Sequence, residues 1–223
     1  MRLVVLDLDG TLADTSADLI AAANACFRDL GAGDRLDPVA DALTAFHGGR
    51  AMLRLGFSRI GDDWTEAEVD AQYPRLLEAY AADIDRHTRL YPGAERAVET
   101  LHSMGYATAI CTNKPAALAE DLLSRLGVRG LFASLVGADT LSTRKPDPAP
   151  YHAAVERAGG ELGRSFLVGD TETDYKTARA VGVPIALVTF GPEGRGVDRF
   201  APDALLDHFD GLPDLAERLL AEG

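Results

Sequence analysis

The chain has 223 residues, 47% of them hydrophobic, which is enough for one large domain or for a core with a smaller inserted domain. Its 35 acidic and 22 basic side chains give a formal net charge of −13, and no Lys/Arg-rich run is present. Such a surface repels nucleic acid and anionic membranes, so the expected partner is a small molecule.

The two cysteines, Cys26 and Cys111, have neither metal-ligand nor CxxC spacing and are expected to pack as small hydrophobic side chains. Nothing resembles a signal peptide, because the N-terminal apolar run stops at Asp7. No apolar stretch approaches membrane-spanning length. We therefore expect a cytoplasmic protein without a membrane partner, and either a monomer or a homodimer.

The first predicted element is a buried strand that ends in Asp7-Leu8-Asp9-Gly10-Thr11. Side chains two residues apart on an extended segment point the same way, so Asp7 and Asp9 can share one pocket. Neighbouring buried carboxylates repel each other and lose hydration, which favours a cation beside them. One carboxylate could attack a substrate while the other transfers a proton.

An Asp-x-Asp-Gly stretch also occurs in calcium-binding loops and in hairpin turns. A calcium-binding EF-hand loop requires Gly at its sixth position and Glu at its twelfth, where this chain has Leu12 and Asp18. A strand also precedes the stretch where an EF-hand has a helix. A plain Asp-Gly turn in a hairpin stays possible from these residues alone.

A helical block follows the first strand. Thr15 and Asp18 are spaced as a capping pair for a helix that lasts until Gly31. Little strand signal occurs between Leu36 and Asp85. The apolar spacing there predicts three further helices, over 40–46, 51–57 and 66–82.

From Tyr91 onward the pattern changes to strand–helix alternation, which is typical of a parallel α/β sheet. Strands are predicted over 106–111, 134–136, 166–168 and 184–188. Helices are predicted over 94–104, 116–126, 151–158, 171–181 and 212–221. The expected fold is thus a Rossmann-like parallel α/β core, residues 1–13 and 88–223, with an all-helical cap inserted over residues 14–87.

Polar residues follow three of the predicted strands, where an α/β sheet binds its ligands. Asp7 and Asp9 end the first strand, Thr112 and Asn113 follow another, and Asp170 follows a third.

Asp174 lies four residues beyond Asp170, on the same face of a helix N-terminus, whose positive partial charge favours carboxylates. These oxygens suit Mg²⁺, which binds through one or two carboxylates, waters and a substrate phosphate. Lys145, in Arg144-Lys145-Pro146-Asp147-Pro148, could supply a further cation.

Each of these residues by itself has an ordinary explanation. Thr112 and Asn113 could cap a strand end, Lys145 could be a solvated loop lysine, and Asp170 and Asp174 could be first-turn aspartates. The four separated segments occur in this order along the chain, and three of them lie at predicted strand ends. This arrangement favours a functional site over four unrelated structural roles.

At this point the chain resembles the haloacid dehalogenase-like hydrolase superfamily. The four motifs that carry the resemblance are Asp7-Leu8-Asp9-Gly10-Thr11, Thr112, Lys145-Pro146 and Gly169-Asp170-Thr171-Glu172-Thr173-Asp174. With the helical insert after the first motif, the resemblance covers nearly the whole chain. Within the superfamily, Thr112-Asn113-Lys114-Pro115, Arg144-Lys145-Pro146-Asp147-Pro148 and Tyr91-Pro92-Gly93 look most like the phosphoglycolate phosphatase branch.

The resemblance implies a Mg²⁺-dependent phosphomonoesterase that acts on a small phosphate ester, and it implies a role for each motif residue. Asp7 would be the nucleophile that forms an aspartyl-phosphate, and Asp9 the general acid/base. Mg²⁺ would be held by the side chains of Asp7 and Asp170 and the main-chain carbonyl of Asp9. Asp174 would orient the metal's water shell. The remaining implied roles are phosphoryl binding by Thr112 and Asn113, and pairing with nucleophile and phosphate by Lys145.

Other functions stay open. Phosphosugar, nucleotide and pyrophosphate phosphatases of similar build share most of these motifs, and a phosphomutase keeps Asp9. Halide-cleaving and carbon–phosphorus-cleaving relatives lack the acid at this position. A catalytically silent metabolite-binding protein is the alternative from another class, although no motif residue is lost here.

Arg50 is the candidate for substrate selection. It follows Gly48-Gly49 at a predicted helix start, where free backbone N–H groups favour anions. A guanidinium also offers the planar fork that fits a carboxylate, and phosphoglycolate carries one in addition to its phosphate. Three other arginines of the cap compete for this role: Arg54, Arg59 and Arg86.

Overall fold

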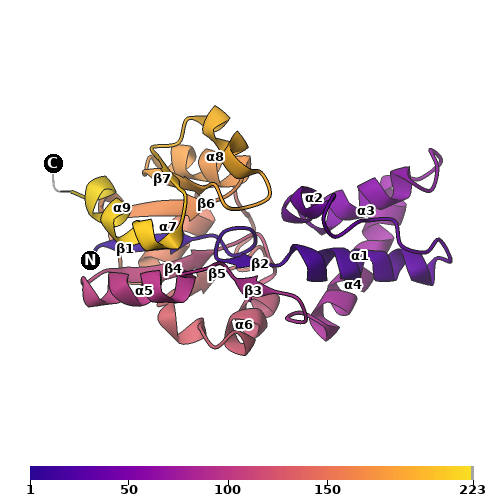
Figure 1. The fold of residues 1–223 in the computed structure, drawn as a ribbon, viewed down its shortest axis with the longest axis horizontal. Coiled ribbons are helices and arrows are strands. Elements are labelled where there is room, and N and C mark those ends of the chain that lie inside the picture. The colour runs from indigo at the N-terminus through magenta and orange to yellow at the C-terminus, as the bar shows by residue number, and fades with distance from the viewer. Residues whose placement is uncertain (222–223) are drawn as a thin grey trace. The chain divides into compact units, whose positions relative to one another are not determined.

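The computed structural model describes residues 1–221 and divides into two compact units (Figure 1). One unit joins residues 1–14 to the chain from residue 90 onward, and the other comprises residues 15–89. The chain therefore leaves the first unit after Asp14 and returns to it at Leu90. The short strands β2 (Ala13–Asp14) and β3 (Arg89–Leu90) pair with each other at the two crossings.

The first unit is built on a six-stranded sheet in the order β5-β4-β1-β6-β7-β8, in which every neighbouring pair is parallel. β1 is central, and its Leu3 lies opposite Ala107 of β4 and Ser165 of β6. The expected α/β class with a parallel sheet is confirmed. The strands are β1 (Leu3–Leu6), β4 (Ala107–Cys111), β5 (Ser134–Val136), β6 (Ser165–Gly169), β7 (Ile185–Val188) and β8 (Ala204–Leu206).

The edge strand β8 is the one strand of this sheet that the sequence pattern did not predict. Its conformation is fixed by its parallel pairing with β7, a contact that has no local signature in the sequence.

Helices lie on both sides of this sheet (Figure 1). Their bounds agree closely with those predicted from the apolar spacing. The helices are α5 (Ala94–Ser103), α6 (Ala116–Arg125), α7 (Ala149–Arg157), α8 (Glu172–Val181) and α9 (Leu212–Leu219), with 3₁₀ turns at η1 (Arg129–Leu131), η2 (Leu162–Arg164), η3 (Gly194–Phe200) and η4 (Phe209–Gly211).

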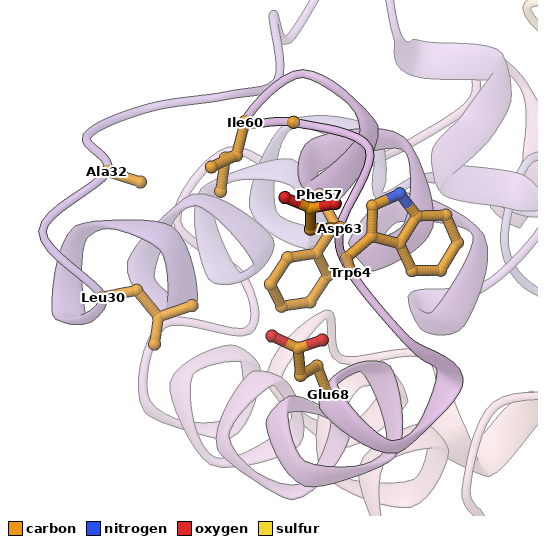
Figure 2. A pocket seen from close by; sticks show the side chains of 8 residues that line it. Leu30, Ala32, Phe57, Ile60, Asp63, Trp64 and Glu68 are labelled. Atoms are coloured by element: carbon orange, nitrogen blue, oxygen red, sulfur yellow. The ribbon is translucent and has the colours of Figure 1, made fainter.

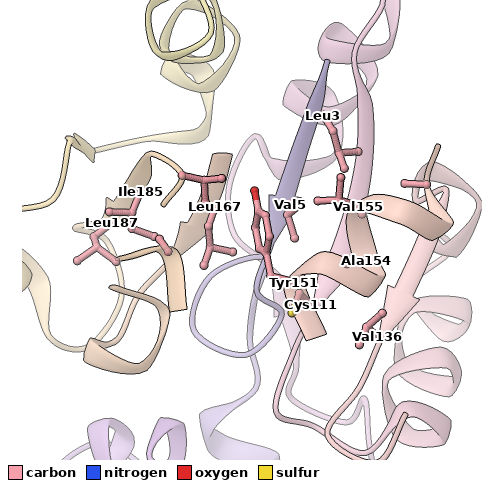
Figure 3. Close-up of a cluster of buried hydrophobic side chains, with 14 of the residues drawn as sticks. Leu3, Val5, Cys111, Val136, Tyr151, Ala154, Val155, Leu167, Ile185 and Leu187 are labelled. Carbon is pink, nitrogen blue, oxygen red and sulfur yellow. The ribbon is translucent and has the colours of Figure 1, made fainter. Parts of the chain in front are cut away.

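One hydrophobic core of this unit lies between the sheet and the helices α7 and α8. Figure 3 shows Tyr151 and Val155 of α7 beside Leu3 and Val5 of β1. The Tyr151 side chain is fully buried, and its hydroxyl donates a hydrogen bond to Ser165 Oγ at 2.9 Å. Because β1 is covered on both faces, its four residues are all buried, which explains why they read as a continuous apolar run.

The second unit is helical, with α1 (Ser16–Asp29), α2 (Ala42–Phe46), α3 (Gly49–Ser58) and α4 (Glu66–Ala82). α1 packs along α4, and α3 contacts both helices. Gly56 lets α3 approach α1 closely, since a Cβ there would fall 2.1 Å from the Phe27 ring. Within residues 1–221, none of the helices has the length and apolar character needed to span a membrane.

The predicted capping pair at the start of α1 is wrong. Thr15 occupies the N-cap position, but its side chain makes no capping hydrogen bond. The buried Asp18 carboxylate instead accepts hydrogen bonds from the backbone N–H groups of His87 and Thr88 and from Thr88 Oγ1, at 2.8–3.0 Å. Asp18 thus ties the start of the helical unit to its end.

Replacing Asp18 with Ala is expected to destabilise the helical unit by about 2–3 kcal/mol, because buried donors of His87 and Thr88 lose their acceptor. Urea unfolding followed by the fluorescence of Trp64, the chain's single tryptophan, measures the change within this unit. Asp34→Ala is the matched control, since its ion pair with Arg28 is exposed and contributes under about 1 kcal/mol. Equal shifts in the two variants would contradict the structural role of Asp18.

Candidate active site

The predicted strand-end residues of the first unit gather at the carboxyl ends of β1, β4 and β6. Asp7 directly follows β1, and its backbone N–H donates to the Val168 carbonyl of β6 at 2.9 Å. Gly10 then turns the chain with a φ of +80°, a value that glycine adopts without strain. Thr11 Oγ1 donates to Asp170 Oδ1 at 2.9 Å, which joins the first motif to the end of β6.

Lys145 links two of the predicted carboxylates. Its Nζ lies 3.1 Å from Asp7 Oδ1 and 2.6 Å from Asp174 Oδ1. The Lys145 side chain is 1% exposed and that of Asp174 is fully buried. A buried ammonium of this kind requires carboxylate partners, because it has lost its hydration. The solvated-loop explanation of Lys145 is therefore wrong.

Burial and neighbouring charges perturb the pKa values of this cluster. Burial raises the pKa of Asp7 to about 6, against the lowering effect of the Lys145 ammonium. Burial, followed by the charges of Asp174 and Asp7, raises the pKa of Asp170 well above its ordinary value. For Lys145, burial alone lowers the pKa, but the Asp174 and Asp7 carboxylates outweigh it and the net direction is upward. Such perturbed groups are typical of functional sites.

Asp174 has two structural tasks within this cluster. Its Oδ1 pairs with Lys145, while its Oδ2 accepts hydrogen bonds from the backbone N–H and hydroxyl of Thr171 at 3.2 and 2.8 Å. The second set forms a capping box that begins α8. Gly169 makes room for this carboxylate, since a Cβ there would fall 2.4 Å from Asp174 Cγ. Both Asp174 oxygens are therefore held by the protein.

The cluster fits a hard divalent cation. Asp7, Asp170 and Asp174 each offer a carboxylate oxygen, and these atoms lie within 4.8 Å of one another. All three side chains are buried. The single positive charge of Lys145 does not balance three carboxylates, so the cluster carries a net negative charge. Oxygen donors of this kind match Mg²⁺. Burial is the first cause of the raised pKa values of Asp7 and Asp170, and repulsion from the neighbouring carboxylates adds to it.

Thr112 and Asn113 lie beyond the end of β4, as predicted. The Thr112 side chain is buried, and its Oγ1 accepts a hydrogen bond from the Lys114 backbone N–H at 3.1 Å. Asn113 is exposed, and its Nδ2 donates to the Lys145 carbonyl at 3.0 Å. Asn113 thus holds the loop that carries Lys145.

Sequence reasoning missed one residue of this site. The Lys114 Nζ lies 2.8 Å from Asp9 Oδ1, and the two side chains are 3% and 17% exposed. The available signal was a lysine directly after two candidate phosphate ligands, Thr112 and Asn113, beside a predicted strand end. The ion pair itself joins residues 105 positions apart and has no local signature.

Arg50, the candidate for substrate selection, belongs to the helical unit. Its Nε donates to Asp70 Oδ1 at 3.0 Å, and its guanidinium lies 3.9 Å from the centroid of the Tyr73 ring. Both partners belong to α4. Arg50 lies in the first turn of α3, near the predicted helix start, and the helix begins at Gly49 after Gly48 with a φ of +96°. The competing arginines are also paired, Arg54 with Glu66, Arg59 with Asp41 and Arg86 with Asp83.

Two open pockets of about 350 and 360 Å³ lie within the helical unit. Figure 2 shows the first, where Phe57 and Trp64 form an apolar wall and the carboxylates of Asp63 and Glu68 lie close by. The second is lined by residues of α1, by the segment around Leu36 and by His87. None of the candidate site residues lines either pocket.

Both cysteines are buried and unbridged, as expected from their spacing. Burial raises the pKa of Cys26 to about 11 and that of Cys111 to about 12, so neither thiol is an activated nucleophile.

The family model of haloacid dehalogenase-like hydrolases matches residues 4–188, and the chain belongs to this family. The resemblance inferred from the motifs is confirmed, and so is the class of enzyme, a hydrolase.

Individual relatives of this chain belong to a narrower group within the family. A phosphoglycolate phosphatase of Mesorhizobium japonicum is 38% identical over 98% of this chain and 96% of its own length. A phosphoglycolate phosphatase of Agrobacterium fabrum is 37% identical over 99% and 95%. Among solved structures, one described as a predicted phosphoglycolate phosphatase from Haemophilus somnus superposes with a TM-score of 0.85 at 24% identity, over 96% of this chain and 97% of its own. This structure supports the fold.

Proposed function

We propose that the protein is a Mg²⁺-dependent phosphomonoesterase that works through an aspartyl-phosphate on Asp7. The observation that carries the proposal is the buried arrangement of Asp7 beside Lys145, with Asp170 and Asp174 completing a carboxylate cluster. A nucleophilic carboxylate, a fixed ammonium and a site for a divalent cation are the parts that phosphoryl transfer requires.

In the first step, an Asp7 carboxylate oxygen attacks phosphorus and the ester P–O bond breaks. The leaving oxygen takes a proton from Asp9. In the second step, a water attacks the phosphorus of the aspartyl-phosphate while Asp9 accepts a proton from that water. The P–O bond to Asp7 breaks, inorganic phosphate leaves, and both carboxyl groups return to their initial states.

Other residues of the site assist by position and charge. Thr112 and Asn113 would donate hydrogen bonds to the phosphoryl oxygens. Lys145 would balance the negative charges of Asp7 and the phosphate. Mg²⁺ would be held by the side chains of Asp7 and Asp170 and the main-chain carbonyl of Asp9, with Asp174 orienting its water shell. When bound, the cation offsets negative charge on the cluster and on the phosphate.

We propose phosphoglycolate as the substrate. The support is that relatives 37–39% identical to this chain over nearly its full length are named phosphoglycolate phosphatase. A panel of phosphorylated metabolites assayed with Mg²⁺ tests the proposal, and phosphoglycolate is expected to have the highest kcat/KM. A higher value for a phosphosugar, a nucleotide or pyrophosphate would reassign the substrate, and isomerisation of a sugar phosphate would indicate a phosphomutase.

The panel also separates an enzyme from a silent binding protein, because a binding protein would hydrolyse none of the esters. The cytoplasmic location and the monomeric or homodimeric state remain predictions from the sequence.

Arg50→Ala is expected to lower kcat/KM for phosphoglycolate selectively, by about 1.5–3 kcal/mol in transition-state binding if a charge-assisted hydrogen bond to the carboxylate is lost. An ester with an uncharged tail should be hydrolysed at nearly the wild-type rate. To make this contact, Arg50 must exchange its bond to Asp70, which an exposed pair permits at little cost.

Arg54→Ala, on the same helix, is the comparison variant, and Arg28→Ala is the control for charge loss in this unit. An equal fall on both esters, or none, would show that Arg50 does not bind the substrate carboxylate. A selective fall in Arg54→Ala would transfer the role to that residue.

A further inference from the structure

We propose that Lys114 is a positioning residue that holds the Asp9 carboxylate for proton transfer, an inference that rests on the proposed phosphatase function. Lys114 Nζ and Asp9 Oδ1 are 2.8 Å apart. The Lys114 side chain is 3% exposed, whereas that of Asp9 is 17% exposed. A buried ammonium binds its carboxylate far more firmly than a solvated one does, so this pair restricts the orientation of Asp9.

The backbone around Lys114 is itself fixed. Its N–H donates to Thr112 Oγ1 at 3.1 Å, and its carbonyl accepts from the Ala138 N–H at 2.9 Å. Gly137 packs so tightly here that a Cβ would fall 2.8 Å from the Lys114 carbonyl oxygen. The lysine therefore extends from a rigid loop at the end of β4, and its ammonium has a defined position from which to hold Asp9.

Each of the two catalytic aspartates pairs with a different lysine. Lys145 binds Asp7 and Asp174, and Lys114 binds Asp9. Asp9 follows Asp7 by two residues, and its side chain has two rotatable bonds. The Lys145 ammonium already pairs with Asp7, so an Asp9 carboxylate that turned toward it would compete with the nucleophile. Lys114 thus keeps the proton-transferring group separate from the attacking group.

This role predicts an effect that depends on the leaving group. An alkyl phosphate expels a strongly basic oxygen, which must receive a proton from Asp9 as the P–O bond breaks. A 2,4-dinitrophenyl phosphate expels a weakly basic phenolate, which needs no proton. The value of kcat/KM covers the steps up to leaving-group departure, so it isolates the first proton transfer from the later hydrolysis of the aspartyl-phosphate.

The test compares Lys114→Met with the wild type on phosphoglycolate and on 2,4-dinitrophenyl phosphate. Misplacing Asp9 should lower kcat/KM for phosphoglycolate by about 10–100-fold, within the roughly 10²–10⁴-fold that an acid/base contributes. The dinitrophenyl ester should be nearly unaffected. Lys176→Met is the matched control, because that lysine is 56% exposed and pairs with Glu172 at the surface, 3.1 Å away.

The same substitution in an Asp9→Asn background completes a double-mutant cycle. If Lys114 acts through Asp9, Lys114→Met causes no further loss once Asp9 is gone. A loss that persists in this background, or one of equal size on both esters, overturns the inference and assigns Lys114 to substrate binding or to folding. Thermal unfolding checks the fold of each variant. Lys114→Gln, which is polar but uncharged and one bond too short to reproduce the contact with Asp9, takes the place of Lys114→Met in both comparisons if the methionine variant does not fold.

The outcomes distinguish the inference from the proposed function. If the wild type hydrolyses neither ester, or if Asp9→Asn leaves phosphoglycolate hydrolysis unchanged, the proposed function or its proton-transfer step is wrong. If Asp9→Asn slows phosphoglycolate selectively and Lys114→Met does not, the inference alone is wrong.

Discussion

Asp7→Asn is expected to abolish turnover, with a loss on the order of 10⁶-fold for removal of a nucleophile. The amide has nearly the shape of the carboxylate but cannot attack phosphorus. The fold should persist, because Lys145 keeps its shorter contact with Asp174, 2.6 Å against 3.1 Å to Asp7. Removal of one buried negative charge also relieves the Asp7 repulsion that, after burial and the Asp174 charge, raises the pKa of Asp170.

Steady-state rates measure turnover, and circular dichroism checks the fold. Acid quenching of a reaction with a ³²P-labelled ester measures the phospho-enzyme. The wild type should trap label on the protein, and Asp7→Asn should trap none. Asp207→Asn is a matched control, since that carboxylate is exposed and pairs with Arg195 at the surface. Wild-type rates from Asp7→Asn without any phospho-enzyme would show that water attacks phosphorus directly.

Removal of Mg²⁺ should have the second largest effect. Excess chelator is expected to reduce turnover to background, and added Mg²⁺ to restore it, because Asp7, Asp170 and Asp174 bring more negative charge together than Lys145 balances. The same cation should stabilise the fold by about 2.7 kcal/mol at a concentration 100 times its dissociation constant. Undiminished turnover in chelator would rule out the metal.

Thermal unfolding separates metal binding from catalysis. Mg²⁺ should raise the Tm of the wild type and of Asp121→Asn, an exposed aspartate on α6 that serves as control. Asp170→Asn should lose most of this shift, since it removes a carboxylate that is proposed to bind the cation and that Thr11 holds in place at 2.9 Å. A full Mg²⁺ shift in Asp170→Asn would exclude Asp170 as a ligand.

The sequence by itself was sufficient for the class of fold and for the main acidic residues. Strand–helix alternation after Tyr91 is a local pattern, and parallel strands place their carboxyl ends at one edge of the sheet. Residues that directly follow a predicted strand, such as Asp7 and Asp170, therefore had to come near one another. The family motifs then assigned chemistry to positions that local patterns had already brought together.

Tertiary structure decided which side chains pair. Asp18 was predicted to cap its own helix, yet it accepts the backbone hydrogen bonds of His87 and Thr88, about 70 residues away along the chain. Asn113 binds the Lys145 carbonyl, and Lys114 reaches Asp9 across 105 positions. Short-range periodicity depends on neighbours within a few residues, whereas an ion pair depends on where two distant segments meet. For this reason the carboxylates of the site were predictable from the sequence, and the lysine that holds Asp9 required the folded chain.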